Sequence, residues 1–160
     1  MYQPGDHVVH PLHGAGVITQ VIRQRVDGQE KSYFVLQLQT ENVRILIPVD
    51  GCASVGVRPV VTCARAEEAL DAFRVLDTGS DASWNRRYRE NMLRLRSGRL
   101  DEVSRVVKSL MLREREHGLS AGERRMLSTA RQILLSELSI ATGQSVEALE
   151  KTLAQLLENG

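Results

Sequence analysis

The side chains with the clearest capacity for chemistry lie in the segment SWNRRYREN, residues 83–91. Trp84 is the single tryptophan of the chain, and Arg86, Arg87 and Arg89 follow it closely. A helix that begins at Trp84 places these cations in its first turns, where each opposes the helix macrodipole at an unscreened cost of about 0.3–1 kcal/mol. Because acidic residues would suit that position better, we infer that the arginines face a polyanion such as a phosphate backbone.

A second basic pair, Arg124-Arg125, stands in the first turn of another predicted helix. Both groups belong to residues 84–131, which hold 13 lysines and arginines against six acidic residues, a net charge of +7. The flanking segments, 1–83 and 132–160, each carry −3, so the near-neutral whole hides the basic block. Such asymmetry indicates an anionic partner. The alternative is a solvated helix face on which arginine stems cover apolar neighbours.

Trp84 favours a nucleic acid as that partner. Proteins that bind the minor groove insert apolar side chains between base steps, beside basic residues that hold phosphates. A tryptophan followed by arginines suits such a wedge, and it equally suits stacking on a base at a single-strand junction. The alternative is a ring at the end of a helix that folds onto the core. The predicted buried stripe of the same helix consists of Tyr88, Met92 and Leu95.

Other functional classes have little support in the sequence. The histidines of HVVHPLHG converge only if the turn folds His13 back, because residues at i and i+3 of a strand point to opposite sides, and two cysteines alone do not form a zinc site. There is no Gly-x-Ser-x-Gly elbow and no glycine-rich phosphate loop. We therefore expect no metal, no cofactor and no enzymatic activity. Cys52 and Cys63 are expected to be free thiols in a reducing cytoplasm, since the chain has neither a secretory signal nor a long apolar run.

In residues 1–60 apolar and polar residues alternate with a period of two, as they do in strands. We expect this segment to form one of the two units that position the candidate side chains. It contains tight-turn signals such as Asp27-Gly28, which suits a hairpin whose central residues need positive φ. This pattern predicts a small antiparallel barrel. Its five strands are predicted at residues 7–10, 16–24, 32–39, 43–49 and 54–61.

From residue 64 onward the apolar spacing becomes helical. A polar connector at 77–83 precedes the tryptophan helix, which Ser83 or Asp81 can cap. The predicted helices cover residues 65–76, about 84–97, 100–117, a segment from the capping box of Ser120 and Glu123 to Gly143, and a last segment capped by Ser145. The chain is thus predicted to be an α+β protein of two domains: a five-stranded antiparallel β barrel at 1–60 and a compact four- to five-helix domain at 64–160.

Four stretches carry a resemblance to a known family. They read GDHVVHPLHGAG (5–16), SVGVR (54–58), WNRRYREN (84–91) and GLSAGERRMLSTARQIL (118–134). Together with the order of the two domains, they resemble the CarD/CdnL family of bacterial transcription regulators over essentially the whole chain. The resemblance implies a Tudor-like domain that docks on the lobe of the RNA polymerase β subunit. It also implies a helical domain that contacts promoter DNA at the upstream edge of the transcription bubble and stabilises the open complex with little base specificity.

The resemblance also implies roles for individual residues. The wedge tryptophan of the family corresponds to Trp84. We also expect the protein to act as a monomer. The expected DNA-binding residues are Trp84, Arg86, Arg87, Arg89, Met92, Arg124 and Arg125, with Trp84, Arg86 and Arg87 facing outward. The expected polymerase-binding residues are Arg25, Arg44, Leu46 and Pro48. The alternative is an adaptor that binds polymerase or a repair helicase without touching DNA, and a buried Trp84 ring would favour it.

Overall fold

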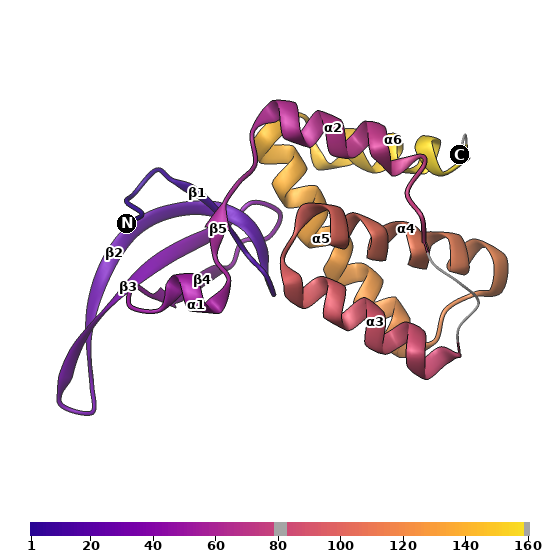
Figure 1. Ribbon diagram of the computed structural model, residues 1–160. Helices are drawn as coiled ribbons and strands as arrows, with labels where there is room; N and C mark the ends of the chain where they lie inside the picture. The colour runs from indigo at the N-terminus through magenta and orange to yellow at the C-terminus, as the bar shows by residue number, and fades with distance from the viewer. Residues whose placement is uncertain (79–82, 159–160) are drawn as a thin grey trace.

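The computed structural model describes residues 1–78 and 83–158, which form a curved sheet beside a bundle of helices (Figure 1). The strands are β1 (His7–His10), β2 (Gly14–Val26), β3 (Gln29–Leu38), β4 (Arg44–Pro48) and β5 (Arg58–Pro59). They pair antiparallel in the order β4-β3-β2-β1-β5. This confirms the predicted α+β class with a five-stranded antiparallel sheet.

The sheet curves around its own small core. Alternation in β3 turns Phe34, Leu36 and Leu38 to the same side, where they pack with Val8 and Ile47. A bulge between Ile18 and Gln20 bends β2, as bulges do wherever an extra residue interrupts the ladder. The β2–β3 hairpin turns at Asp27 and Gly28, which both have positive φ as predicted.

The predicted strand at 54–61 is wrong over most of its length. Cys52–Val55 form a single helical turn, α1, and only the two residues of β5 pair with β1. Gly51 and Gly56 flank α1 in the left-handed conformation, with φ of 86° and 100°. Glycine adopts this conformation without the steric cost of a Cβ, so the chain enters and leaves the helical turn abruptly.

Five longer helices follow in the described part of the chain, within the predicted number. They are α2 (Cys63–Phe73), α3 (Trp84–Ser97), α4 (Leu100–His117), α5 (Ala121–Thr142) and α6 (Val146–Glu158). The Thr62 side chain accepts from the backbone N–H of Arg65 and so begins α2 two residues before the predicted start. None of the described helices is both long and apolar enough to cross a membrane.

The hydrophobic core of the helices also includes residues of the sheet. α5 runs through the middle of the bundle and also contacts β2 (Figure 1). The apolar cluster around Leu110, Leu134 and Leu153 includes Val9 of β1 and Ala15 of β2. The two parts of the chain therefore share a hydrophobic core as well as a covalent connection.

The β1–β2 turn lies directly against α5. The Ala15 N–H donates to Ser136 Oγ at 2.9 Å, and the side-chain amide of Gln132 donates to the carbonyl of His13 at 3.2 Å. Gly14 has a φ of +100°, and a Cβ built on it would lie 2.8 Å from Ser136 Oγ. Both the backbone conformation and the close approach therefore require glycine at this position.

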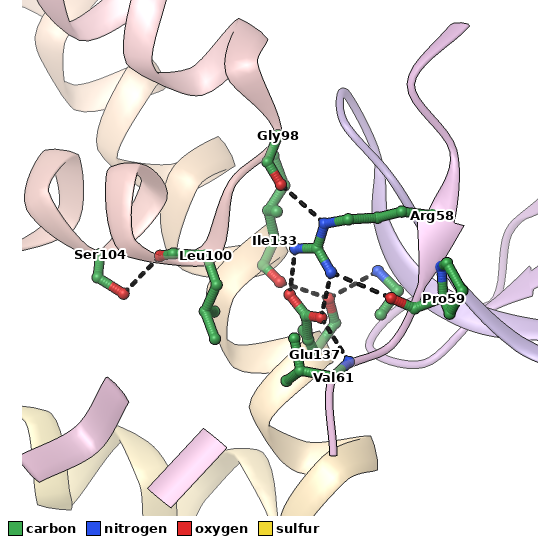
Figure 2. A network of polar contacts seen from close by, with 10 residues as sticks. Arg58, Pro59, Val61, Gly98, Leu100, Ser104, Ile133 and Glu137 are labelled. Carbon is green, nitrogen blue, oxygen red and sulfur yellow. Dashed lines mark hydrogen bonds and ion pairs between the residues drawn. The ribbon is translucent and has the colours of Figure 1, made fainter. Parts of the chain in front are cut away.

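A buried ion pair joins β5 to α5 (Figure 2). The Arg58 guanidinium donates to both carboxylate oxygens of Glu137, at 2.6 and 2.7 Å, and its Nε donates to the carbonyl of Gly98 at 2.9 Å. Glu137 also accepts from the Val61 N–H at 3.0 Å, and its side chain is 1% exposed. One arginine therefore connects the last strand, the central helix and the end of α3.

Lys108 of α4 holds the end of α2. Its buried ammonium donates to the carbonyls of Arg74 and Leu76 at 2.7 and 3.0 Å. A cation suits the negative end of a helix macrodipole, although burial lowers the pKa of Lys108. This contact fixes the chain shortly before the segment that leads to α3.

His10 is expected to make the fold sensitive to mild acid. Burial, and to a smaller degree the neighbouring His13, lower the pKa of His10, whose Nδ1 accepts from the Leu12 N–H at 3.1 Å. The folded chain thus favours the neutral ring, whereas the unfolded chain takes up a proton below about pH 6.5. The stabilisation by His10 is complete above that pH and declines as the pH falls through its lowered pKa.

Urea unfolding at pH 7.5 and pH 5.5 measures this effect. Wild type should lose more stability between the two pH values than His10→Gln does, because the substitution removes the titrating group. His117→Gln is the matched control, because it removes an exposed histidine and leaves His10 in place. Equal pH dependence in wild type and His10→Gln would contradict the assignment.

Candidate nucleic-acid and polymerase interfaces

The start of α3 presents Trp84 at the surface in a fixed position. Ser83 caps the helix by accepting from the Arg86 N–H, which confirms one of the two predicted caps, whereas Asp81 lies outside the described residues. The indole ring stacks on Tyr88, with centroids 5.1 Å apart and planes 18° apart. Its Nε1–H donates to Ser120 Oγ at 3.2 Å, yet Trp84 remains 43% exposed. The ring is therefore held on two sides and open on the rest.

The acceptor of the indole N–H belongs to the predicted capping box at the start of α5. Ser120 Oγ accepts from the Glu123 N–H at 3.2 Å, and a Glu123 carboxylate oxygen accepts from the Ser120 N–H at 3.4 Å. The Ser120 hydroxyl also lies 3.2 Å from the same carboxylate oxygen, to which it donates. The box thus begins α5 and at the same time holds Trp84 of α3.

Arg87 stabilises this arrangement from the interior. Its side chain is 18% exposed and lies 3.7 Å from the carboxylate of Glu123, which is buried and also lies 3.8 Å from Arg113 of α4. The expectation that Arg87 faces outward with Trp84 is wrong, because α3 turns Arg87 toward α5. A buried carboxylate needs cationic partners, and Arg87 supplies one of them.

The exposed arginines of α3 lie on two sides of the helix. Arg89 and Arg96 share a shallow hollow with Trp84, Tyr88 and Met92. Arg86 pairs instead with Glu90 at 3.1 Å, one turn along the helix. The predicted stripe of Tyr88, Met92 and Leu95 is fully buried only at Leu95, so the first two also contribute to the surface beside Trp84.

Arg96 is a candidate residue that the sequence reasoning missed. It follows Arg89 by seven residues, a spacing that places both side chains on the same face of a helix. It also lines the hollow beside Met92. The helical period was therefore sufficient to find it.

Arg124 and Arg125 are both exposed but lie on different walls of α5. Arg125 lines a groove between α3 and α5, together with Met92 and Arg96. Arg124 lines a separate hollow between α5 and α6 that also contains Glu114 and Glu150. Of the pair, only Arg125 therefore shares a groove with the residues beside Trp84.

The candidate polymerase-binding residues lie mainly on the edge strand β4. Arg44, Leu46 and Pro48 are exposed and alternate with the inward-facing Ile45 and Ile47. Leu46 is 45% exposed, a high value for an apolar residue in a strand. The structure therefore brings these three predicted residues together on one outer face.

Arg25 does not share that face. The register pairs Leu46 with Val35 and Val35 with Gln20, so alternation along β2 places Gln24 on the Leu46 side and Arg25 on the other. Arg25 is also the next-to-last residue of β2, at the tip of the β2–β3 hairpin, which points away from the bundle of α2 to α6 (Figure 1). Gln24 is the hairpin residue that extends the β4 face.

Removing the hydroxyl of Ser120 is expected to loosen Trp84 without unfolding α5. Glycine replaces serine at a helix N-cap at a cost of only a few tenths of a kcal/mol, but it leaves the indole N–H without its acceptor. Because Trp84 is the only tryptophan, the intrinsic tryptophan fluorescence reports this ring alone. Ser120→Gly should show stronger acrylamide quenching and lower fluorescence anisotropy than wild type.

Ser145→Gly is the matched control, since Ser145 accepts from the Ala148 N–H at the start of α6 and is remote in sequence from the indole contact. Its fluorescence should equal that of wild type. Unchanged quenching in Ser120→Gly would show that the Ser120 hydroxyl does not hold the ring.

This fold and these surfaces define a class of protein: a Tudor-like β domain joined to a helical domain that exposes an aromatic and basic face. Residues 2–61 match the family described as CarD-like/TRCF RID domain, and residues 68–154 match CarD, C-terminal domain. The chain is also 30% identical over 143 residues to YdeB, a proposed transcription factor of Bacillus subtilis (strain 168); the alignment spans 89% of this chain and 94% of YdeB. The protein belongs to the CarD family and is a CarD-like transcription factor that interacts with RNA polymerase.

Proposed function

We propose that this protein binds the RNA polymerase β subunit through residues 1–60 and stabilises the promoter open complex through residues 64–160, with Trp84 as a wedge at the upstream edge of the bubble. The observation that carries the proposal is the state of Trp84, which is 43% exposed yet held by Tyr88 and Ser120. A ring already fixed in one orientation loses little conformational freedom when it inserts between bases. The open-complex lifetime with Trp84→Ala tests the proposal.

The mechanism combines a tether with a preference for melted DNA. Binding to the β subunit raises the local concentration of the helical domain at the fork. Arginine side chains contact phosphates and fix the position of the domain, while Trp84 enters a minor groove whose bases are already partly unstacked. Because the protein then binds the open state better than the closed state, the equilibrium shifts toward the open complex.

The proposed DNA-binding residues have different parts in this mechanism. Arg86, Arg89 and Arg125 are exposed and contact phosphates, and Met92 lies beside the wedge. Arg87 acts mainly through Glu123, which it helps to hold in place for Ser120 and Trp84. Arg124 lies on the other wall of α5 and contacts phosphates farther from the wedge.

The proposal also includes the location and the oligomeric state of the protein. We propose that it acts as a monomer in the cytoplasm, at the nucleoid, through its attachment to polymerase. An adaptor without DNA contact would need no exposed tryptophan, so the 43% exposure of Trp84 supports the DNA-contacting function over that alternative.

Leu46→Glu is expected to abolish binding to the β subunit. Leu46 lies between Arg44 and Pro48 on the outer face of β4, and a carboxylate there would have to be desolvated in the interface. A pull-down of the purified β subunit by the tagged protein measures the effect. We expect the affinity to fall at least tenfold, which corresponds to a loss of about 1.4 kcal/mol of binding free energy. Val75→Glu, at an exposed apolar position after α2, is the control and should bind normally. Normal binding of Leu46→Glu would move the dock to another face.

A further inference from the structure

The groove between α3 and α5 has the size and chemistry of a binding site. It encloses about 440 Å³, within the range of small-ligand pockets. Its floor is apolar and consists of Met92, Leu95, Met126 and Ile133, and the β1–β2 turn borders it with Leu12, which is 63% exposed. A flat apolar group that covers this floor removes apolar surface from water, which favours its binding.

The rim of the groove is basic. Arg96 lies on the α3 side and Arg125 on the α5 side, both exposed, and no acidic residue is among the described side chains that line it. The hollow on the other wall of α5 differs, because Glu41, Glu114 and Glu150 line it together with Arg124 and Arg131. The α3–α5 groove therefore suits a ligand that is apolar in its middle and anionic at its ends.

The groove is continuous with the surface around Trp84. Tyr88, Met92 and Arg96 line both the groove and the hollow that contains the indole. Tyr88 stacks on Trp84 and packs at the same time near Gly122 at the start of α5. The surface beside Trp84 therefore leads directly into the groove.

We propose that the α3–α5 groove binds one unpaired DNA nucleotide next to the Trp84 wedge, with its base on the apolar floor and its flanking phosphates at Arg96 and Arg125. This inference rests on the proposed function, because it takes the DNA fork as the ligand. The groove thus reads the presence of an unstacked base, a feature of the open complex that duplex DNA lacks. Stacking and apolar contact with a base do not depend on its identity, so the site requires no particular sequence.

The experiment uses RNA polymerase holoenzyme on promoter DNA in which the most upstream unpaired nucleotide, in one strand and then in the other, carries either a base or an abasic site. The measured quantity is the factor by which the full-length protein lengthens the open-complex half-life on each DNA. This ratio cancels the effect of the abasic site on polymerase itself. With wild type, the factor should be roughly fivefold larger on the DNA that has the base, the lower end of what one stacked base contributes.

Thr129→Phe tests the groove from the protein side. Thr129 is an exposed α5 residue that lines the groove, so a phenylalanine there occupies the space of the base. This variant should give the same small factor on both DNAs. Ser128→Phe is the matched control, because Ser128 is its exposed neighbour and lines the hollow on the other wall. It should behave like wild type.

The outcomes separate the groove from the wedge. If wild type lengthens the half-life equally on both DNAs in each strand, while Trp84→Ala loses the effect, the groove proposal is overturned and the wedge stands. If Trp84→Ala has the wild-type effect, the proposed function fails and the groove proposal fails with it. Because the comparison of the two DNAs uses wild-type protein, a folding defect of Thr129→Phe does not affect it.

Discussion

Replacing Arg58 by alanine is expected to lower the free energy of unfolding by about 3–5 kcal/mol, the usual effect of removing one partner of a buried ion pair. The free energy is lost because the Glu137 carboxylate would stay buried without its cationic partner. Glu137 is 1% exposed, and of the three N–H groups that donate to its carboxylate in the described structure only that of Val61 would remain. The carbonyl of Gly98 would lose its guanidinium donor at the same time. Urea denaturation of wild type and Arg58→Ala measures the difference.

Arg99→Ala is the matched control for Arg58→Ala. Arg99 pairs with Asp101 at 3.5 Å, but both side chains are exposed, and such surface pairs contribute about 1 kcal/mol or less. A small effect at Arg99 and a large one at Arg58 would establish that burial, rather than loss of an arginine, accounts for the cost. A loss of less than 1 kcal/mol in Arg58→Ala would contradict the account of a buried connection.

The Arg58–Glu137 pair also bears on the proposed mechanism. It holds β5, in the part that is proposed to bind polymerase, against α5, and its bond to Gly98 reaches the end of α3, which begins at Trp84 (Figure 2). A tether raises local concentration most effectively when the geometry between its two ends matches the span of the sites. The buried pair therefore supports a fixed distance between the dock and the wedge.

The helices could be predicted from the sequence because their ends have local signals. Gly98 and Gly143 have the positive φ of helix C-caps, and Ser120 with Glu123 forms the predicted capping box. The predicted bounds 84–97 and 100–117 agree with α3 and α4. Each signal acts within one helical turn, so one sequence is enough to detect it.

The contacts between distant segments could not be predicted in the same way. Arg58 and Glu137 are 79 positions apart, and the buried Glu137 looks like an ordinary solvent-facing acid in the sequence. Arg87 turns inward because Glu123 of another helix lies beside it, and no local pattern in the sequence indicates that contact. The side occupied by Arg25 depends on strand register, which a pattern of alternating residues does not fix once a bulge shifts it.

Replacing Trp84 by alanine is expected to preserve the fold and the binding to polymerase but to remove the stabilisation of the open complex. The fold should persist because Trp84 is 43% exposed and its neighbour Tyr88 keeps the contact with the helical core. A loss of about 1.4 kcal/mol of preferential binding to melted DNA changes the equilibrium tenfold. Trp84→Phe should keep part of the effect, because it retains an apolar ring but loses the hydrogen bond to Ser120.

Leu93→Ala is the control for truncating an exposed apolar side chain on the same helix. Leu93 is 60% exposed and lines the hollow that contains Trp84. It should retain most of the wild-type effect, since it has neither the ring nor the bond to the capping box. A loss equal to that of Trp84→Ala would point to a general apolar contact instead of a wedge.

The most direct test of the central claim is the half-life of the promoter open complex with wild type and with Trp84→Ala. Both proteins must be present at concentrations that give equal occupancy of the β subunit, so that only the DNA contact differs. We predict a half-life about tenfold longer with wild type than with Trp84→Ala, which should leave the complex as short-lived as polymerase alone. Equal half-lives with the two proteins, both longer than with polymerase alone, would contradict the wedge at Trp84.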